Sequence, residues 1–179
     1  MNLPNRITLA RIFLIPFFMA LLLSKIPYGK WLAAAVFIIA ALTDSLDGYL
    51  ARSSNQITDL GKVLDPLADK LIVAAALIVL VQLGQLSSWI VVIIIAREFG
   101  VSGLRIMAAA KNKIVAASFL GKAKTLSQSL AVIFWIFKIG QKATWVNNTA
   151  WILMVVAVIL TLYSGFDYFM RLKKVLEGS

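Results

Sequence analysis

The chain has 179 residues, of which 61% are hydrophobic, and its mean hydropathy is +0.89. This composition excludes an ordinary soluble domain and indicates an integral membrane protein. The net charge of +10 would suit nucleic acid in a soluble protein, but in so hydrophobic a chain it indicates attraction to anionic lipid and phosphorylated substrates.

The chain contains neither cysteine nor histidine. Disulfides and a zinc site of the usual His/Cys type are therefore excluded. Any general base has to be a carboxylate or a lysine.

Apolar stretches close to membrane-spanning length follow one another along the chain. A short amphipathic segment, Met1 to Arg11, precedes the first and predicts a short N-terminal interfacial helix. No small-residue cleavage motif follows the first stretch, so we expect it to be a mature helix. The six predicted spans are Ile7–Leu23, Trp31–Leu50, Leu64–Leu83, Trp89–Ala109, Thr125–Ile139 and Thr149–Phe169. The predicted fold is all-α integral membrane, with residues 1–179 in a single domain.

Positive charges are distributed unequally between the predicted loops. With the N-terminus on the inner side, thirteen of the 18 lysines and arginines lie on that side, four lie outside, and Arg97 lies within a span. No acidic residue falls in an outer loop. The positive-inside rule therefore predicts a cytoplasmic N-terminus in a multi-pass protein of the cell membrane.

Residues 43–70 place aspartates where two predicted membrane helices meet a polar link. Asp44 and Asp47 are three residues apart, and Asp65 and Asp69 are four apart, so each pair falls on one helix face. If the helices are antiparallel neighbours, the carboxylates converge and would take up protons unless a cation joined them. Such oxygen ligands suit Mg²⁺, Mn²⁺ or Ca²⁺, and Mg²⁺ commonly shares its ligands with a substrate phosphate. The stretch predicts phosphate chemistry at one or two divalent ions.

The position of these aspartates also predicts the depth of the site. Asp44 follows Trp31 by thirteen residues, or about 20 Å of helix, which leaves it about 10 Å short of the inner edge of a ~30 Å hydrocarbon core. We therefore expect a polar metal-binding cavity that is open to the cytoplasm. Pro66 suits the first turn of a helix that Asp65 caps, and Asp59 is expected in the solvated link.

The aspartates belong to a longer pattern that includes two glycines and an arginine. Glycine permits close approach of a ligand, and arginine can bind a phosphate with two donors. The pattern D-x2-D-G-x2-A-R-x8-G-x3-D-x3-D is formed by Asp44, Asp47, Gly48, Ala51, Arg52, Gly61, Asp65 and Asp69. At every position it resembles the signature of the CDP-alcohol phosphotransferase family.

This resemblance implies roles for the residues of the pattern. The aspartates would be ligands of two divalent ions, Mg²⁺ or Mn²⁺, and Asp69 would also be the general base. Gly48, Arg52 and Gly61 would hold the CDP moiety. Thr8 belongs to an N-x2-T segment similar to one that lies near the nucleotide pocket in many relatives, so it is a further candidate for CDP-diacylglycerol binding.

The fourth predicted span carries charges inside the membrane, and these have two interpretations. Arg97 and Glu98 can form an ion pair that neutralises itself. Alternatively, Arg97 and Arg105, about two turns apart and about 80° around the helix axis, point into one cavity and bind phosphate. Lys122 and Lys124, in the segment GKAKT, are additional cationic candidates.

The segments REFGVSGLR, at 97–105, and GKAKT, at 121–125, resemble those of the bacterial phosphatidylglycerophosphate synthases within this family. The resemblance implies transfer of a phosphatidyl group from CDP-diacylglycerol to sn-glycerol 3-phosphate, with release of CMP. It also implies a homodimer. The residues that would hold the acceptor phosphate are Arg97, Arg105, Lys122 and Lys124. No specific function is predicted for the fifth and sixth spans beyond a surface ion pair between Asp167 and Arg171.

Three other functions fit parts of this pattern. A related enzyme with another acceptor, such as inositol phosphate or serine, would share the aspartates. An intramembrane prenyltransferase also uses paired aspartate motifs with Mg²⁺, but it lacks the D-G-x2-A-R spacing. A cation channel or transporter would place acidic residues along a path across the membrane, whereas here they cluster on one side.

Overall fold

The computed structural model describes the backbone of residues 3–53, 59–110 and 119–177, and the side chains of residues 9–43, 68, 70–108, 121, 123–171 and 173. All secondary structure in these ranges is α-helical, as predicted. The helices are α1 (Leu3–Leu23), α2 (Gly29–Ser53), α3 (Asp59–Gln82), α4 (Ser88–Ala110), α5 (Phe119–Lys138) and α6 (Thr144–Glu177).

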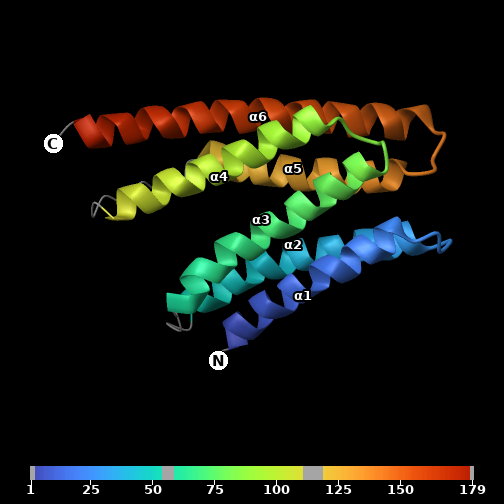
Figure 1. Cartoon of the computed structure of the whole chain (residues 1–179), viewed down its shortest axis with the longest axis horizontal. Helices are drawn as coiled ribbons and strands as arrows, with labels where there is room; N and C mark the ends of the chain where they lie inside the picture. The colour runs from blue at the N-terminus through green and yellow to red at the C-terminus, as the bar shows by residue number, and fades with distance from the viewer. Residues whose placement is uncertain (1–2, 54–58, 111–118, 178–179) are drawn as a thin grey trace.

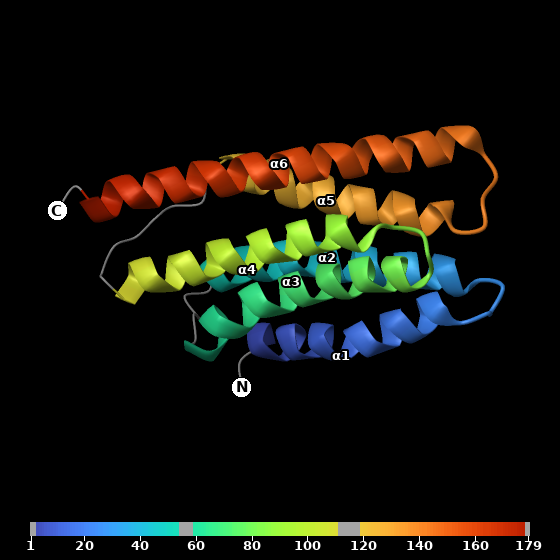
Figure 2. The ribbon, with the colours of Figure 1, turned by 45° about the horizontal axis from the view of Figure 1, so that its top comes forward.

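The helices lie side by side in an elongated bundle (Figure 1). α1 packs against α2 and α3, and α6 packs against α5 and α4. α5 also contacts α2 and α3, so it joins the two groups of helices. The connections at 24–28, 83–87 and 139–143 lie at one end of the bundle, and both termini lie at the other (Figure 2). Successive helices therefore run in opposite directions along the bundle (Figure 1 and Figure 2).

A continuous apolar core holds the six helices together. Each helix contributes a large side chain that is at most 1% exposed: Phe18, Phe37, Leu77, Ile94, Trp135 and Met154. Buried alanines, among them Ala33, Ala76 and Ala131, lie between these large residues. Small side chains let helix backbones approach closely, which favours this kind of packing in membrane proteins.

Several predicted helix boundaries are wrong. α5 begins at Phe119 and not at Thr125, and α6 covers Thr144–Glu177 and not Thr149–Phe169. Residues 3–23 form one helix, so within the described residues the expected interfacial helix is not separate from the first span. Pro4 lies in the first turn of α1, where its missing N–H breaks no helical hydrogen bond. α3 begins at Asp59, so Asp59 is not in a loop and Asp65 is not an N-cap. An acidic residue is favourable at this helix start because it interacts with the helix dipole.

Apolar surface covers much of the outside of the bundle. Within the described residues, one helical segment, Thr144–Arg171 of α6, is long and apolar enough to cross a membrane, and only 28% of its most apolar window is buried. Shorter apolar helical segments cover Leu9–Leu23, Gly29–Thr43 and Lys70–Gln82. Exposed apolar area of this extent is rare in soluble monomers and is typical of a surface in contact with lipid.

Candidate functional site

The predicted metal ligands belong to two antiparallel helices that contact each other. Asp44 and Asp47 lie in the second half of α2, and Asp65 and Asp69 lie in the first half of α3. The end of α2 and the start of α3 lie at the same end of the bundle as both termini (Figure 1). The fold therefore makes neighbours of the two helices that carry the motif.

The motif side chains themselves lie outside the described side chains, so their predicted roles stay predictions. The same holds for the other candidates of this group, and the full set is Thr8, Asp44, Asp47, Gly48, Arg52, Gly61, Asp65, Asp69 and Lys122. Among the side chains that are described, no three acidic groups lie close enough to hold a metal ion. The donor set of the motif nevertheless fits a hard divalent cation, because carboxylate oxygens are what Mg²⁺ and Mn²⁺ prefer.

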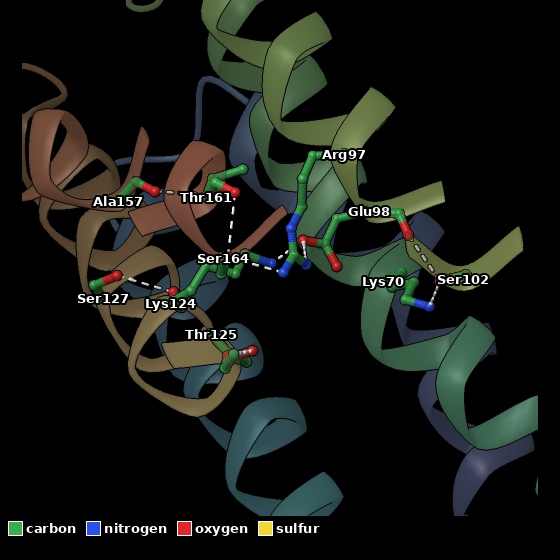
Figure 3. A network of polar contacts seen from close by, with 11 residues as sticks. Lys70, Arg97, Glu98, Ser102, Lys124, Thr125, Ser127, Ala157, Thr161 and Ser164 are labelled. Carbon is green, nitrogen blue, oxygen red and sulfur yellow. Dashed lines mark hydrogen bonds and ion pairs between the residues drawn. The ribbon is translucent and has the colours of Figure 1, made fainter. Parts of the chain in front are cut away.

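A second group of charges lies between α4, α5 and α6 (Figure 3). One carboxylate oxygen, Glu98 Oε1, accepts a hydrogen bond from Arg97 Nη1 at 3.3 Å and another from Lys124 Nζ. The ion pair of Arg97 and Glu98, one of the two interpretations of these charges, is thus present, and Lys124 shares its carboxylate. Two cations, one on α4 and one on α5, thus share one carboxylate oxygen. The binding of phosphate by Arg97 stays a prediction.

α6 holds the other side of the Arg97 guanidinium. Arg97 Nη2 donates a hydrogen bond to Ser164 Oγ at 2.8 Å, and Ser164 Oγ donates to the carbonyl of Thr161 at 3.2 Å (Figure 3). The next residue, Gly165, lies directly against the Arg97 side chain, since a Cβ atom there would be 3.0 Å from Arg97 Cγ. Arg97 is therefore fixed by contacts from two helices.

The second arginine of α4 also faces α6. The Arg105 guanidinium lies over the ring of Tyr168, with Cζ 5.4 Å from the ring centroid. This is the distance range of a cation–π interaction. Tyr168 follows Ser164 by one helical turn, so both arginines contact the same side of α6.

A third contact joins the aspartate-bearing α3 to α4. Lys70, the residue after Asp69, donates a hydrogen bond to Ser102 Oγ, which in turn donates to the carbonyl of Glu98 at 2.7 Å (Figure 3). Next to this contact, a groove runs between α3, α4 and α5. Its polar lining residues are Lys70, Glu98, Lys124, Thr125 and Gln128.

Sequence reasoning missed several of these residues. Ser164, Gly165 and Tyr168 were assigned no function, although serine and glycine interrupt an otherwise apolar helix. Arg11 was counted only as an inner-side charge. It is 2% exposed in α1, the helix that packs against both aspartate-bearing helices. The available signal was an arginine within the predicted span Ile7–Leu23, because ionisable residues inside a membrane span are rare unless they serve a site.

The geometry described above can be compared with known proteins. The profile of the CDP-alcohol phosphatidyltransferase family matches residues 1–163, which include the complete aspartate motif and the charges of α4 and α5. The chain belongs to this family. Its resemblance to the family, inferred from eight motif residues, is thereby confirmed.

Curated relatives align with nearly the whole chain. A CDP-diacylglycerol–glycerol-3-phosphate 3-phosphatidyltransferase of Bacillus subtilis is 44% identical, covering 99% of this chain and 98% of the relative. A protein of the same name from Rickettsia bellii is 38% identical, covering 97% of this chain and 96% of the relative. Another from Escherichia coli K12 is also 38% identical, covering 93% of this chain and 92% of the relative. No part of the chain long enough to form another domain is left outside these alignments.

Proposed function

We propose that this protein transfers the phosphatidyl group of CDP-diacylglycerol to sn-glycerol 3-phosphate, giving phosphatidylglycerophosphate and CMP. The observation that carries the proposal is the complete aspartate motif on neighbouring helices, in a chain that aligns over nearly its full length with enzymes named for that reaction. The protein is accordingly a transferase of phospholipid biosynthesis.

The reaction exchanges substituents at the β-phosphorus of CDP-diacylglycerol. A hydroxyl oxygen of glycerol 3-phosphate forms a new ester bond to this phosphorus while the pyrophosphate bond breaks, and CMP leaves. Phosphoryl transfer depends on positioning and charge neutralisation more than on covalent catalysis. In this chain Asp69 accepts the proton of the attacking hydroxyl, as the family resemblance implies.

The donor substrate and its metal would be held by the first three helices. Asp44, Asp47, Asp65 and Asp69 are the proposed ligands of two divalent ions, Mg²⁺ or Mn²⁺. When bound, such ions supply neutralisation of the negative charge on the pyrophosphate. Arg52 would donate to the same phosphates, while Gly48 and Gly61 let the nucleotide approach the backbone and Thr8 donates from α1.

The acceptor would be held by the cationic residues of α4 and α5. Arg97, Arg105, Lys122 and Lys124 are the proposed ligands of its phosphate group. The contacts of Arg97 and Lys124 with the same oxygen of Glu98 support this, because they place cations of α4 and α5 side by side. A phosphorylated acceptor requires such a second basic site, whereas an acceptor alcohol without an anionic group does not need it.

The decisive experiment measures CMP release by the purified protein in detergent with CDP-diacylglycerol and Mg²⁺ or Mn²⁺. Glycerol 3-phosphate, inositol phosphate, serine and no acceptor are compared, with the Asp69→Asn variant as control. We expect turnover with glycerol 3-phosphate alone, and none in the variant. Turnover with a different acceptor would contradict glycerol 3-phosphate as the acceptor but agree with the family. Transport activity without CMP release would contradict the proposed enzymatic function.

We also propose that the chain crosses the membrane several times with its N-terminus in the cytoplasm. The unequal distribution of lysine and arginine supports this topology. Because the chain has no cysteine, single-cysteine variants can be labelled cleanly with an impermeant maleimide in intact cells. Lys25→Cys and Lys142→Cys should react from outside, and Arg171→Cys only after the cells are opened. The reverse labelling pattern would show that the orientation is opposite to the one proposed.

A homodimer is proposed from the family resemblance. Light scattering of the detergent complex, corrected for bound detergent, should give twice the chain mass of 19.6 kDa. A value of one chain mass at all protein concentrations would refute it.

A further inference from the structure

One face of α6 carries three residues that contact both arginines of α4. Ser164 and Gly165 are adjacent, and Tyr168 follows within one turn, so the three lie on one face of the helix. Ser164 is 1% exposed and Tyr168 is 3% exposed. We call Ser164, Gly165 and Tyr168 the α6 stripe; all three lie beyond residues 1–163, which the family profile matches.

The first two residues of the stripe determine where Arg97 lies. Ser164 Oγ accepts its hydrogen bond at 2.8 Å, while Gly165 leaves the space that the aliphatic part of Arg97 occupies. An alanine at 165 would bring its Cβ to 3.0 Å from Arg97 Cγ, which is tighter than ordinary van der Waals contact. The arginine would then have to move away from α6.

The third residue of the stripe acts through its ring. Tyr168 lies beneath the Arg105 guanidinium, and among the described residues its hydroxyl has no hydrogen-bond partner. The contact between Tyr168 and Arg105 therefore depends on the aromatic face and not on the hydroxyl. The ring restricts a long side chain that would otherwise sample many rotamers.

We propose that the α6 stripe positions Arg97 and Arg105 for the phosphate of the acceptor, so that Ser164, Gly165 and Tyr168 set the affinity for that substrate. The inference rests on the proposed function, in which these arginines bind glycerol 3-phosphate. Arginine side chains lose much conformational entropy when they are held in one geometry. Contacts that restrict them beforehand reduce the cost of binding the acceptor.

The test compares the Michaelis constants of the two substrates in stripe variants of the full-length protein. Ser164→Ala, Gly165→Ala and Tyr168→Leu should each raise the KM for glycerol 3-phosphate about three- to tenfold, the range that corresponds to the net contribution of one typical hydrogen bond. The KM for CDP-diacylglycerol and the kcat should change by less than about twofold, because among the described residues α6 packs against α4 and α5 and not against α2 or α3.

Each substitution has a matched control on the same or a neighbouring helix. Thr161→Val removes a buried hydroxyl that bonds only the Ala157 carbonyl of its own helix, and Gly100→Ala adds a Cβ that meets nothing within 4 Å. Tyr168→Phe keeps the ring and removes the unpartnered hydroxyl. All three controls should keep the wild-type KM for glycerol 3-phosphate, and a rise in the Phe variant would overturn positioning by the ring.

An Arg97→Gln variant separates failure of this inference from failure of the proposed acceptor site. If Arg97→Gln raises the KM for glycerol 3-phosphate and the stripe variants do not, the stripe has no positioning role while the acceptor site stands. If Arg97→Gln leaves that KM unchanged, the acceptor site itself is refuted, and the stripe inference with it.

The KM of a double variant distinguishes positioning of Arg97 from a purely structural role of the stripe. In the Arg97→Gln background, Ser164→Ala should add less than about twofold to the KM, because its partner is already gone. A full additional increase would overturn the inference. The inference would also be overturned if the stripe variants lowered the melting temperature and the amount of active enzyme but kept the wild-type KM for glycerol 3-phosphate.

Discussion

The two halves of this molecule assemble their functional residues in different ways. In α1–α3 the proposed donor site depends on a single motif that spans residues 44–69 of two consecutive, neighbouring helices. In α4–α6 the cationic group combines residues from three helices, from Arg97 on α4 to Tyr168 on α6. The first site is a local arrangement, while the second exists only once α6 has packed against α4 and α5.

This difference agrees with the chemistry that each half is proposed to perform. The proposed donor site would bind a CDP-linked substrate, and the family profile covers all of its residues. The acceptor site must discriminate between alcohols, and part of its support lies on Ser164, Gly165 and Tyr168, beyond the region that the profile matches. Substitutions in the first half should therefore abolish the reaction, and those in the second half should change its substrate affinity or the stability of the fold.

Removal of the metal should have the largest effect. Treatment with EDTA is expected to abolish CMP release, because the pyrophosphate charge would no longer be neutralised, and excess Mg²⁺ or Mn²⁺ should restore it. Turnover is measured before chelation, after it and after each addition. Full activity in EDTA would refute a metal site on α2 and α3.

The Asp69→Asn substitution should cause the next largest loss of turnover. Loss of the proton acceptor should lower kcat by about 10²–10⁴-fold, with the melting temperature near wild type. The matched control is Asp167→Asn, the same chemical change at a residue that pairs with Arg171 at the end of α6. If the Asp69 variant kept more than about a tenth of the wild-type kcat, the assignment of the base would be wrong.

Glu98→Gln should affect stability more than chemistry. It leaves Arg97 and the buried Lys124 without their shared carboxylate, which should cost about 1–3 kcal/mol of unfolding free energy. Removing the lysine charge as well, in Glu98→Gln with Lys124→Met, should recover part of that loss. Thermal unfolding in detergent measures both variants, and a double variant less stable than the single one would contradict this account.

The smallest effect is expected at the surface of α6. Arg171 donates to Asp167 at 3.0 Å, and its side chain is 55% exposed. Arg171→Gln should lower stability by no more than about 0.5 kcal/mol, since solvent and salt screen such pairs. A loss above about 1 kcal/mol would mean that this end of α6 packs against something more than its own helix.

Some features of the fold followed from local patterns alone. Apolar stretches bounded by polar turns predicted six helices, and their described counterparts begin and end within a few residues of most predicted boundaries. The exceptions are the starts of α1, α3, α5 and α6, at Leu3, Asp59, Phe119 and Thr144, and the end of α6 at Glu177. These helices extend into more polar sequence, where hydropathy gives no signal but the backbone can still form helical hydrogen bonds.

The motif and the family were determined by the sequence, because they depend on residue types at short, fixed separations. The ion pair of Arg97 with Glu98 was predictable for the same reason. Its extension to Lys124, the contacts of Ser164 and Tyr168 and the burial of Arg11 depended on how distant helices pack. Only the tertiary structure decided these, since hydropathy sets which helices enter the bilayer but not which of their faces meet.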